Sequence, residues 1–221
     1  MKFVWMIACA VILFLPVLGS ATTLTFTTHA SPTNTATDSI SASLTNGGAQ
    51  LAVNVIVPNS AWSTIPGVPW VSPYQTGDQN APGFVEEPNG TNFWFTQTIY
   101  IPIGFHMSSA TLIFGADDTA NVWVNGVQLL YSSNSQAVNC SAMVPGCKTN
   151  TFFNGDIKTL LQPGENVLLS QNIQTGRYSL GITDSLTIVG EQDRSVPKPL
   201  TSAMVGLGLF GLGLVRRHRR S

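Results

Sequence analysis

The stretch from Ser108 to Tyr131 constrains the fold more than any other part of the chain, because it predicts strands and turns together. Ala, Leu and Phe alternate with Thr and Ile in Ala110–Phe114, and Ala and Val alternate with Asn and Trp in Ala120–Asn125, with the period of two expected in strands. A Gly-Ala-Asp-Asp-Thr turn separates these segments, and Asn125-Gly126 supplies the residue pair that a type I′ hairpin turn requires. The stretch therefore predicts a meander of three strands.

Strand patterns recur along the rest of the chain, and no convincing helical period occurs apart from a turn around Asp156–Leu161. Phe93–Ile101 is nearly continuously β-prone and is predicted to be a central strand, whereas Leu51–Val57 is predicted to place its alternate residues on one face. The other predicted strands are Leu24–Thr27 and Ile40–Leu44, both as edge strands, and segments beginning at Asn166 and within Tyr178–Val189. The prediction is an all-β domain over residues 22–190.

Three segments together resemble a known family. They are the ADD-x-A-x-VWVNG pattern at Ala116–Gly126, DIKTLLQPGENVLL at Asp156–Leu169 and YSLGITDSLTIVG at Tyr178–Gly190. This set resembles the galactose-binding-like jelly roll, in particular the sugar-binding accessory domains of glycoside hydrolases, over roughly Phe93–Gly190. The resemblance implies a jelly-roll β-sandwich and leaves the ligand open, because the fold carries many unrelated activities.

Charge argues against one class of partner. Between Thr22 and Gly190 three cationic side chains stand against nine carboxylates, so the formal net charge of this region is −6. A domain with this charge repels phosphate backbones, and nucleic-acid binding is not expected.

The first 21 residues have the layout of a secretory signal. A single Lys2 precedes an apolar run from Phe3 to Leu18, and the small residues Gly19-Ser20-Ala21 follow. Cleavage is predicted after Ala21, which predicts an exported domain. The alternative is an uncleaved N-terminal anchor, although the run is shorter than the ~20 residues that a membrane span needs.

The loop from Ala61 to Thr91 contains the candidate ligand-binding residues Trp62, Trp70 and Tyr74 among five prolines. One interpretation is that these rings are exposed and stack on the apolar face of a sugar. The other is that Trp62 and Trp70 cap one end of the sandwich core, because large aromatic side chains are mostly buried.

No cofactor is expected, and a structural calcium ion is the alternative considered. Three carboxylates of the same loop could contribute oxygen ligands, although their spacing is not that of an EF-hand: Asp78, Glu86 and Glu87.

Cys140 and Cys147 are the only cysteines left once the signal is removed. Two thiols close together in a polar loop of an exported chain predict a disulfide. Their spacing is not that of a CxxC metal motif, and no histidine lies nearby in the sequence to complete a zinc site.

Beyond a polar linker, the C-terminus combines Pro197-Lys198-Pro199, an apolar run from Leu200 to Val215, and a basic tip. The arginines of this tip are Arg216, Arg217, Arg219 and Arg220. This order resembles the PEP-CTERM sorting signal, with Lys198 where that family's motif has Glu. The resemblance implies linker and motif over residues 191–199, a transmembrane segment and tail over 200–221, and processing by an exosortase.

Catalytic motifs are scarce. His29, His106 and His218 are scattered, and Asp117-Asp118 falls in a predicted tight turn where backbone hydrogen bonds account for both carboxylates. A non-catalytic protein is therefore predicted. The first hypothesis is a surface-tethered matrix protein associated with exopolysaccharide, as the sorting-signal resemblance implies. The alternatives are a carbohydrate-binding module with a specific glycan and an enzyme whose fold gathers at least two titratable residues with shifted pKa values.

Overall fold

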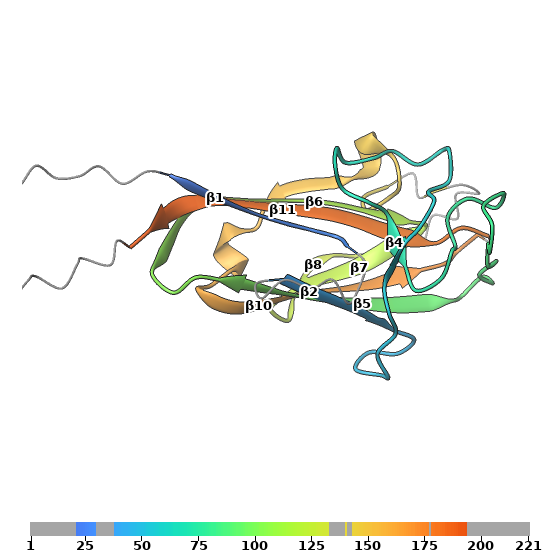
Figure 1. Ribbon diagram of the computed structural model, residues 1–221, viewed down its shortest axis with the longest axis horizontal. Coiled ribbons are helices and arrows are strands. Elements are labelled where there is room, and N and C mark those ends of the chain that lie inside the picture. The colour runs from blue at the N-terminus through green and yellow to red at the C-terminus, as the bar shows by residue number, and fades with distance from the viewer. Residues whose placement is uncertain (1–20, 30–37, 133–139, 141–142, 177, 194–221) are drawn as a thin grey trace, which may run out of the picture.

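The computed structural model describes residues 21–29, 38–132, 140, 143–176 and 178–193, which form a sandwich of two antiparallel β-sheets (Figure 1). Helix is confined in these residues to two short 3₁₀ turns, η1 (Thr149–Thr151) and η2 (Lys158–Leu160). The predicted all-β sandwich is confirmed. Residues 1–20 of the predicted signal, the motif Pro197-Lys198-Pro199 and the apolar tail lie outside the described residues. Within the described part, no helix is long and apolar enough to cross a membrane.

The larger sheet has six strands in the order β3-β4-β11-β6-β9, and β1 pairs with β11 beside this path. These strands are β1 (Thr22–Thr27), β3 (Asn54–Val55), β4 (Val71–Ser72), β6 (Phe105–Asp117), β9 (Phe153–Asp156) and β11 (Gly181–Gln192). Because Thr22 pairs with Gly190, β1 begins where β11 ends. Both described ends of the chain therefore leave from the same end of the sandwich (Figure 1).

The smaller sheet has five strands in the order β2-β5-β10-β7-β8. These are β2 (Asp38–Ser43), β5 (Asn92–Ile101), β7 (Thr119–Val124), β8 (Val127–Leu130) and β10 (Gly164–Ile173). Strand β5 pairs with β2 on one side and β10 on the other, so the predicted central strand is confirmed, and β2 is an edge strand as predicted.

The predicted three-stranded meander is only partly right. Strands β7 and β8 form a hairpin whose turn residues Asn125 and Gly126 have φ angles of 50° and 80°, as a type I′ turn requires. Strand β6, however, pairs with β11 and β9 in the other sheet. The chain crosses between sheets at Asp117-Asp118, where the sequence pattern predicted a turn within one sheet.

The predicted strand Leu51–Val57 is also corrected. Only Asn54–Val55 pairs as a strand, and the alternation does not place one set of side chains inward. Val53 is fully buried, whereas Val55 and Val57 are 54% and 51% exposed. The segment pairs with the two-residue β4 and, through a single bridge between Leu51 and Ala42, with β2, so it does not form one continuous strand.

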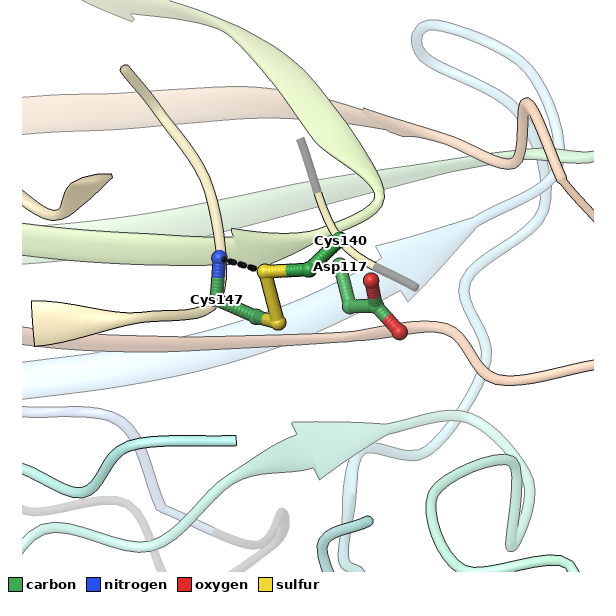
Figure 2. Close-up of side chains that lie close together, drawn as sticks. All are labelled: Asp117, Cys140 and Cys147. Carbon is green, nitrogen blue, oxygen red and sulfur yellow. Dashed lines mark hydrogen bonds between the residues drawn. A yellow bond between two sulfur atoms is a disulfide. The ribbon is translucent and has the colours of Figure 1, made fainter. Parts of the chain in front are cut away.

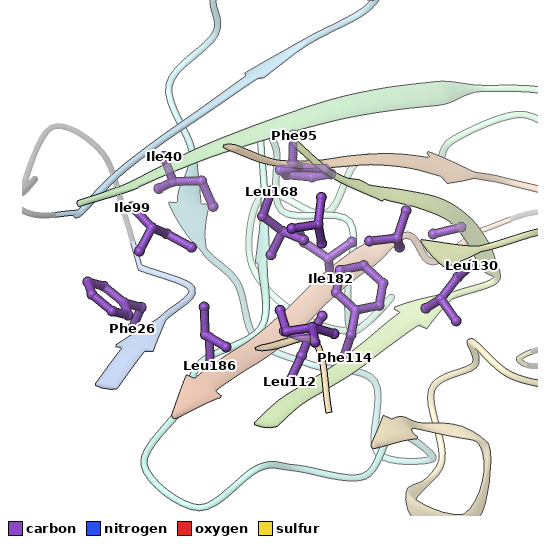
Figure 3. Packing of buried hydrophobic residues seen from close by; sticks show 14 of the residues in the cluster. Phe26, Ile40, Phe95, Ile99, Leu112, Phe114, Leu130, Leu168, Ile182 and Leu186 are labelled. Atoms are coloured by element: carbon purple, nitrogen blue, oxygen red, sulfur yellow. The ribbon is translucent and has the colours of Figure 1, made fainter. Parts of the chain in front are cut away.

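The core lies between the two sheets, where alternate residues of facing strands meet (Figure 3). Phe95, Ile99 and Leu168 of the smaller sheet face Phe114, Leu112, Ile182 and Leu186 of the larger one in this view. Each fully buried side chain of this kind contributes about 1.5–3 kcal/mol of hydrophobic free energy. Because the inward residues are used here, the alternate residues of the five-stranded sheet face solvent.

Candidate functional site

The outer face of the five-stranded sheet, meaning the side turned away from the core, is built by simple alternation. Along β5, the residues from Phe93 to Ile101 that point inward are buried, and those between them are partly or fully exposed. Strand β10 repeats this pattern in register with β5. The outward residues of these two strands are Asn92, Trp94, Thr96, Thr98, Tyr100, Glu165, Val167, Leu169, Gln171 and Ile173.

Two tryptophans meet on this face. Trp94 on β5 is paired with Gln171 of β10, and Trp123 on β7 is paired with Leu169 of the same strand. The two rings reach toward each other across β10 and stack, with centroids 5.7 Å apart and planes inclined by 20°. Both residues are partly exposed. Stacking of this kind contributes about 0.5–1.5 kcal/mol beyond the free energy of the apolar area that it buries.

A row of primary amides crosses the strands beside this ring pair. Asn121 Nδ2 donates to Gln171 Oε1 at 2.9 Å, and Gln171 Nε2 donates to Asn92 Oδ1 at 3.1 Å. Gln128 Nε2 on β8 donates to Asn121 Oδ1 at 3.5 Å. We refer to Asn92, Gln171, Asn121 and Gln128 as the amide row.

Further polar groups lie on the other side of the rings. Thr96 and Thr98 are the next two outward residues of β5 after Trp94. They pair with Ser41 and Ser39 of the neighbouring strand β2. The outer face thus combines two aromatic rings with side chains that both donate and accept hydrogen bonds.

The ligand-binding residues predicted from the sequence lie elsewhere. Trp62 and Trp70 are 8% and 1% exposed, with ring centroids 4.4 Å apart, and they pack with the Cys140–Cys147 disulfide. The Trp70 indole also donates to the Ser63 carbonyl at 2.9 Å. Neither ring offers a face to a sugar in this structure, because the loop folds back and buries both of them.

Tyr74 is 41% exposed, and its ring meets Phe93 edge to face at 5.9 Å. The structure therefore does not bring Trp62, Trp70 and Tyr74 together as one exposed aromatic surface. Tyr74 alone of the three is accessible.

The predicted disulfide between Cys140 and Cys147 is confirmed, with Cα atoms 5.5 Å apart (Figure 2). The Asp117 carboxylate lies close to both sulfurs. Among the described residues, these three form the only group of three or more potential metal ligands that lie close enough together to hold an ion. Bonded sulfurs are not thiolates, and the thiolate is the metal ligand, so the group in this oxidised state is not a metal centre. Asp78, Glu86 and Glu87 do not converge on a common point among the described residues.

The two carboxylates at the sheet crossing have different environments. Asp118 Oδ2 accepts hydrogen bonds from the backbone N–H groups of Thr175 and Gly176, at 2.8 and 2.7 Å. Burial raises the pKa of Asp117 well above its usual value, and the adjacent Asp118 raises this pKa further. The predicted backbone hydrogen bonding is therefore confirmed for Asp118, although its donors lie in a distant loop, whereas Asp117 Oδ1 has no hydrogen-bond partner among the described residues.

A second pair of acidic residues lies inside the sandwich. Burial raises the pKa of Asp184 to about 8, with a smaller contribution from the charge of Asp38. Burial also raises the pKa of Asp38, although hydrogen bonds from Gln97 and the nearby His29 oppose this effect. These carboxyl groups are 1% and 9% exposed, so a substrate in solvent does not reach Asp184 in this structure.

Sequence reasoning did not identify Trp94 or Trp123 as site residues. A usable signal existed for Trp123, because Val122 and Val124 alternate with it and are predicted to face the core, which places Trp123 outward. A weaker signal existed for Trp94, because it shares alternate positions with Thr96 and Thr98, opposite the apolar Phe93 and Phe95.

No family model matches the chain, and no curated protein matches it. Among solved structures, an α-L-rhamnosidase from Streptomyces avermitilis complexed with L-rhamnose is similar at 20% identity and a TM-score of 0.37, over 47% of this chain and 9% of the enzyme. A family 35 carbohydrate binding module from Clostridium thermocellum is similar at 14% identity and a TM-score of 0.32, over 69% of this chain and 98% of the module. A β-glucosidase from Kluyveromyces marxianus is similar at 13% identity and a TM-score of 0.34, over 66% of this chain and 17% of the enzyme. Similarities at this level carry no argument about a ligand, which has to come from the side chains themselves.

Proposed function

We propose that this chain is a non-catalytic carbohydrate-binding β-sandwich that holds a glycan on the outer face of its five-stranded sheet. The observation that carries the proposal is the Trp94–Trp123 pair beside the amide row. A pyranose ring has an apolar face of C–H groups and a rim of hydroxyls. An aromatic ring beside convergent polar groups can contact both parts at once.

The chemistry of the amide row suits hydroxyl groups. A primary amide has two N–H donors and a carbonyl with two acceptor positions, and the bond between Asn121 and Gln171 uses only part of this capacity. Asn121 Oδ1 already accepts from Gln128 and from the Ser132 N–H. Asn92 Nδ2 donates to a backbone carbonyl. Gln171 keeps one N–H and one acceptor position that can bind sugar hydroxyls without breaking the row. The binding geometry is therefore largely formed before a ligand arrives, which lowers the entropy cost of binding.

The non-catalytic part of the proposal rests on where the titratable groups lie. The carboxyls with raised pKa values at Asp117 and Asp184 are buried, and neither is on the outer face. The outer face itself carries Glu165 at one end, six residues along β10 from Gln171. Paired carboxylates across a substrate, as glycoside hydrolysis requires, are not formed by the described residues of this face.

Cellular placement belongs to the same proposal. The sandwich is of the galactose-binding-like jelly-roll kind, it is exported with cleavage after Ala21, and the C-terminal segment anchors it transiently until an exosortase removes the tail. These points are supported by the sequence resemblances and by the signal-like N-terminus. Together they describe a surface or matrix protein associated with extracellular polysaccharide.

The test is binding of the purified chain to a panel of polysaccharides by affinity gel electrophoresis. Retardation in the gel gives the affinity for each polymer. Trp94→Ala and Trp123→Ala should each lower this affinity at least tenfold, and Trp94→Phe should retain most of the binding. Tyr74→Ala is the matched control, since this exposed aromatic residue lies in the loop and not on the sheet. If both tryptophan variants bind as the parent does, the ring pair is not part of the ligand site. If Tyr74→Ala alone loses binding, the ligand site is at the loop.

A further inference from the structure

We infer that the glycan is an uncharged polysaccharide and that its chain lies across the strands, along the amide row. This inference rests on the proposed function and adds the chemical class and the orientation of the ligand. It is carried by two separate features of the outer face, namely its charge and the direction in which its polar groups are lined up.

Cationic side chains are missing from this face among the described residues. The two lysines of the described part are Lys148, next to η1, and Lys158, in η2, and neither belongs to a strand of the five-stranded sheet. Acidic polysaccharides carry carboxylates or sulfates, which proteins bind through lysine or arginine. Among the described residues, the side chains of the outer face offer such groups only amides, hydroxyls and indole N–H groups.

The charge that is present would repel an acidic chain. Glu165 is exposed on the outward side of β10 and pairs with Tyr100 at the end of the sheet. The domain around it is also acidic, with a formal net charge of −6 over residues 22–190. An anionic polymer therefore meets repulsion over long range, and no described residue of this face supplies a cation at contact.

The amide row sets the direction. It crosses from β5 through β10 and β7 to β8, which are three strand spacings or about 14 Å. The ring pair spans three of these four strands, because Trp94 is on β5 and Trp123 is on β7. A chain lying across the strands contacts rings and amides along its length, whereas a chain lying along β10 meets the row at Gln171 only.

The charge test uses matched pairs of polymers with the purified full chain. Suitable pairs are dextran with carboxymethyl dextran, hydroxyethyl cellulose with carboxymethyl cellulose, and arabinoxylan with glucuronoxylan. We expect every polymer that binds to do so in its uncharged form, at least tenfold more tightly than its acidic partner, with little change between low and high salt. Gln171→Lys should weaken binding of the neutral polymer and create salt-sensitive binding of the acidic one.

The orientation test compares Gln128→Ala with Thr98→Ala. Gln128 ends the amide row three strand spacings from β5, or about 14 Å, and pairs with Trp123. Thr98 lies four residues along β5 from Trp94, or about 13 Å. Gln128→Ala should lower affinity several-fold and Thr98→Ala should not. The reverse result overturns the orientation, provided that thermal melts show both variants folded.

The remaining outcomes separate this inference from the proposed function. Salt-sensitive binding of acidic polymers by the parent chain, lost in Trp94→Ala, overturns the uncharged ligand while the binding face stands. No binding of any polymer in the panel overturns both.

Discussion

The buried carboxyl of Asp184 should make the protein more stable in mildly acid than in mildly alkaline solution. This side chain is 1% exposed on β11 between Ile182 and Leu186, and its Oδ1 has no hydrogen-bond partner among the described residues. Burial raises its pKa to about 8, from 3.8 for an exposed aspartate. The folded chain therefore prefers the neutral carboxylic acid.

The sign of the effect follows from proton binding. Between pH 4 and pH 8 the folded chain holds the Asp184 proton and the unfolded chain has lost it, so raising the pH favours unfolding. The stabilisation is fully present below about pH 4 and is lost as the pH rises through about 8. The slope is about 1.4 kcal/mol per pH unit, which gives on the order of 4 kcal/mol between pH 4 and pH 7. The raised pKa values of Asp38 and Asp117 act in the same direction.

Asp184→Asn tests this reasoning because the amide keeps the shape and cannot ionise. The variant should match the parent near pH 4 and exceed its free energy of unfolding by several kcal/mol at pH 8. Urea unfolding followed by tryptophan fluorescence across this pH range measures the difference. Glu165→Gln, which removes an exposed carboxylate, is the control and should leave the pH dependence of the parent unchanged.

A parent whose stability is flat or rises from pH 5 to pH 8 would refute the reasoning. So would an Asp184→Asn variant that runs parallel to the parent over the whole range. Either result means that the charged carboxylate is stabilised inside the sandwich.

Three further predictions concern the core, the disulfide and the tail. Val122 is fully buried, so Val122→Asp should lower the free energy of unfolding by several kcal/mol in thermal or urea unfolding. Asn121→Asp on the outer face is the control and should cost under about 1 kcal/mol. Equal losses would mean that the register of β7 is wrong. The disulfide joins residues seven apart, so replacing Cys140 and Cys147 by Ser should cost about 2 kcal/mol, and two free thiols in the exported, unreduced chain by mass spectrometry would contradict its formation there. If the tail is a sorting signal, intact-mass measurement of the surface form should find an end near Pro197–Pro199, and recovery of the chain through Ser221 would show a permanent anchor instead.

What could be predicted from the sequence is what local chemistry determines. Asn125-Gly126 adopts positive φ at low cost, so the β7–β8 hairpin follows from the two residues in its turn. Alternation places Val122 and Val124 inward, and both are buried. The close spacing of Cys140 and Cys147 likewise makes their pairing a local matter.

What could not be predicted depends on partners distant in the sequence. The residues between β6 and β7 can serve a hairpin within one sheet or a crossing between sheets, and the choice is made by the pairing of β6 with β11, far along the chain. The alternation of Leu51–Val57 predicts a strand, but a strand forms only where β4 supplies hydrogen bonds.

The same limit applies to the candidate site. The outward position of Trp123 follows from its own strand, but its contact with Trp94 depends on the register of β5, β10 and β7 together. The burial of Trp62 and Trp70 depends on the loop folding back over the disulfide, and no periodicity in the sequence encodes this contact.

The most direct test of the binding face is an NMR titration that follows the indole N–H resonances. Once the signal segment with Trp5 is removed, four tryptophans remain, two on the outer face and two in the buried cluster. Addition of a polysaccharide fragment that binds should shift the signals of Trp94 and Trp123 and leave those of Trp62 and Trp70 in place. Shifts confined to Trp62 and Trp70, with Trp94 and Trp123 unmoved at saturation, would contradict the assignment of the site to the five-stranded sheet.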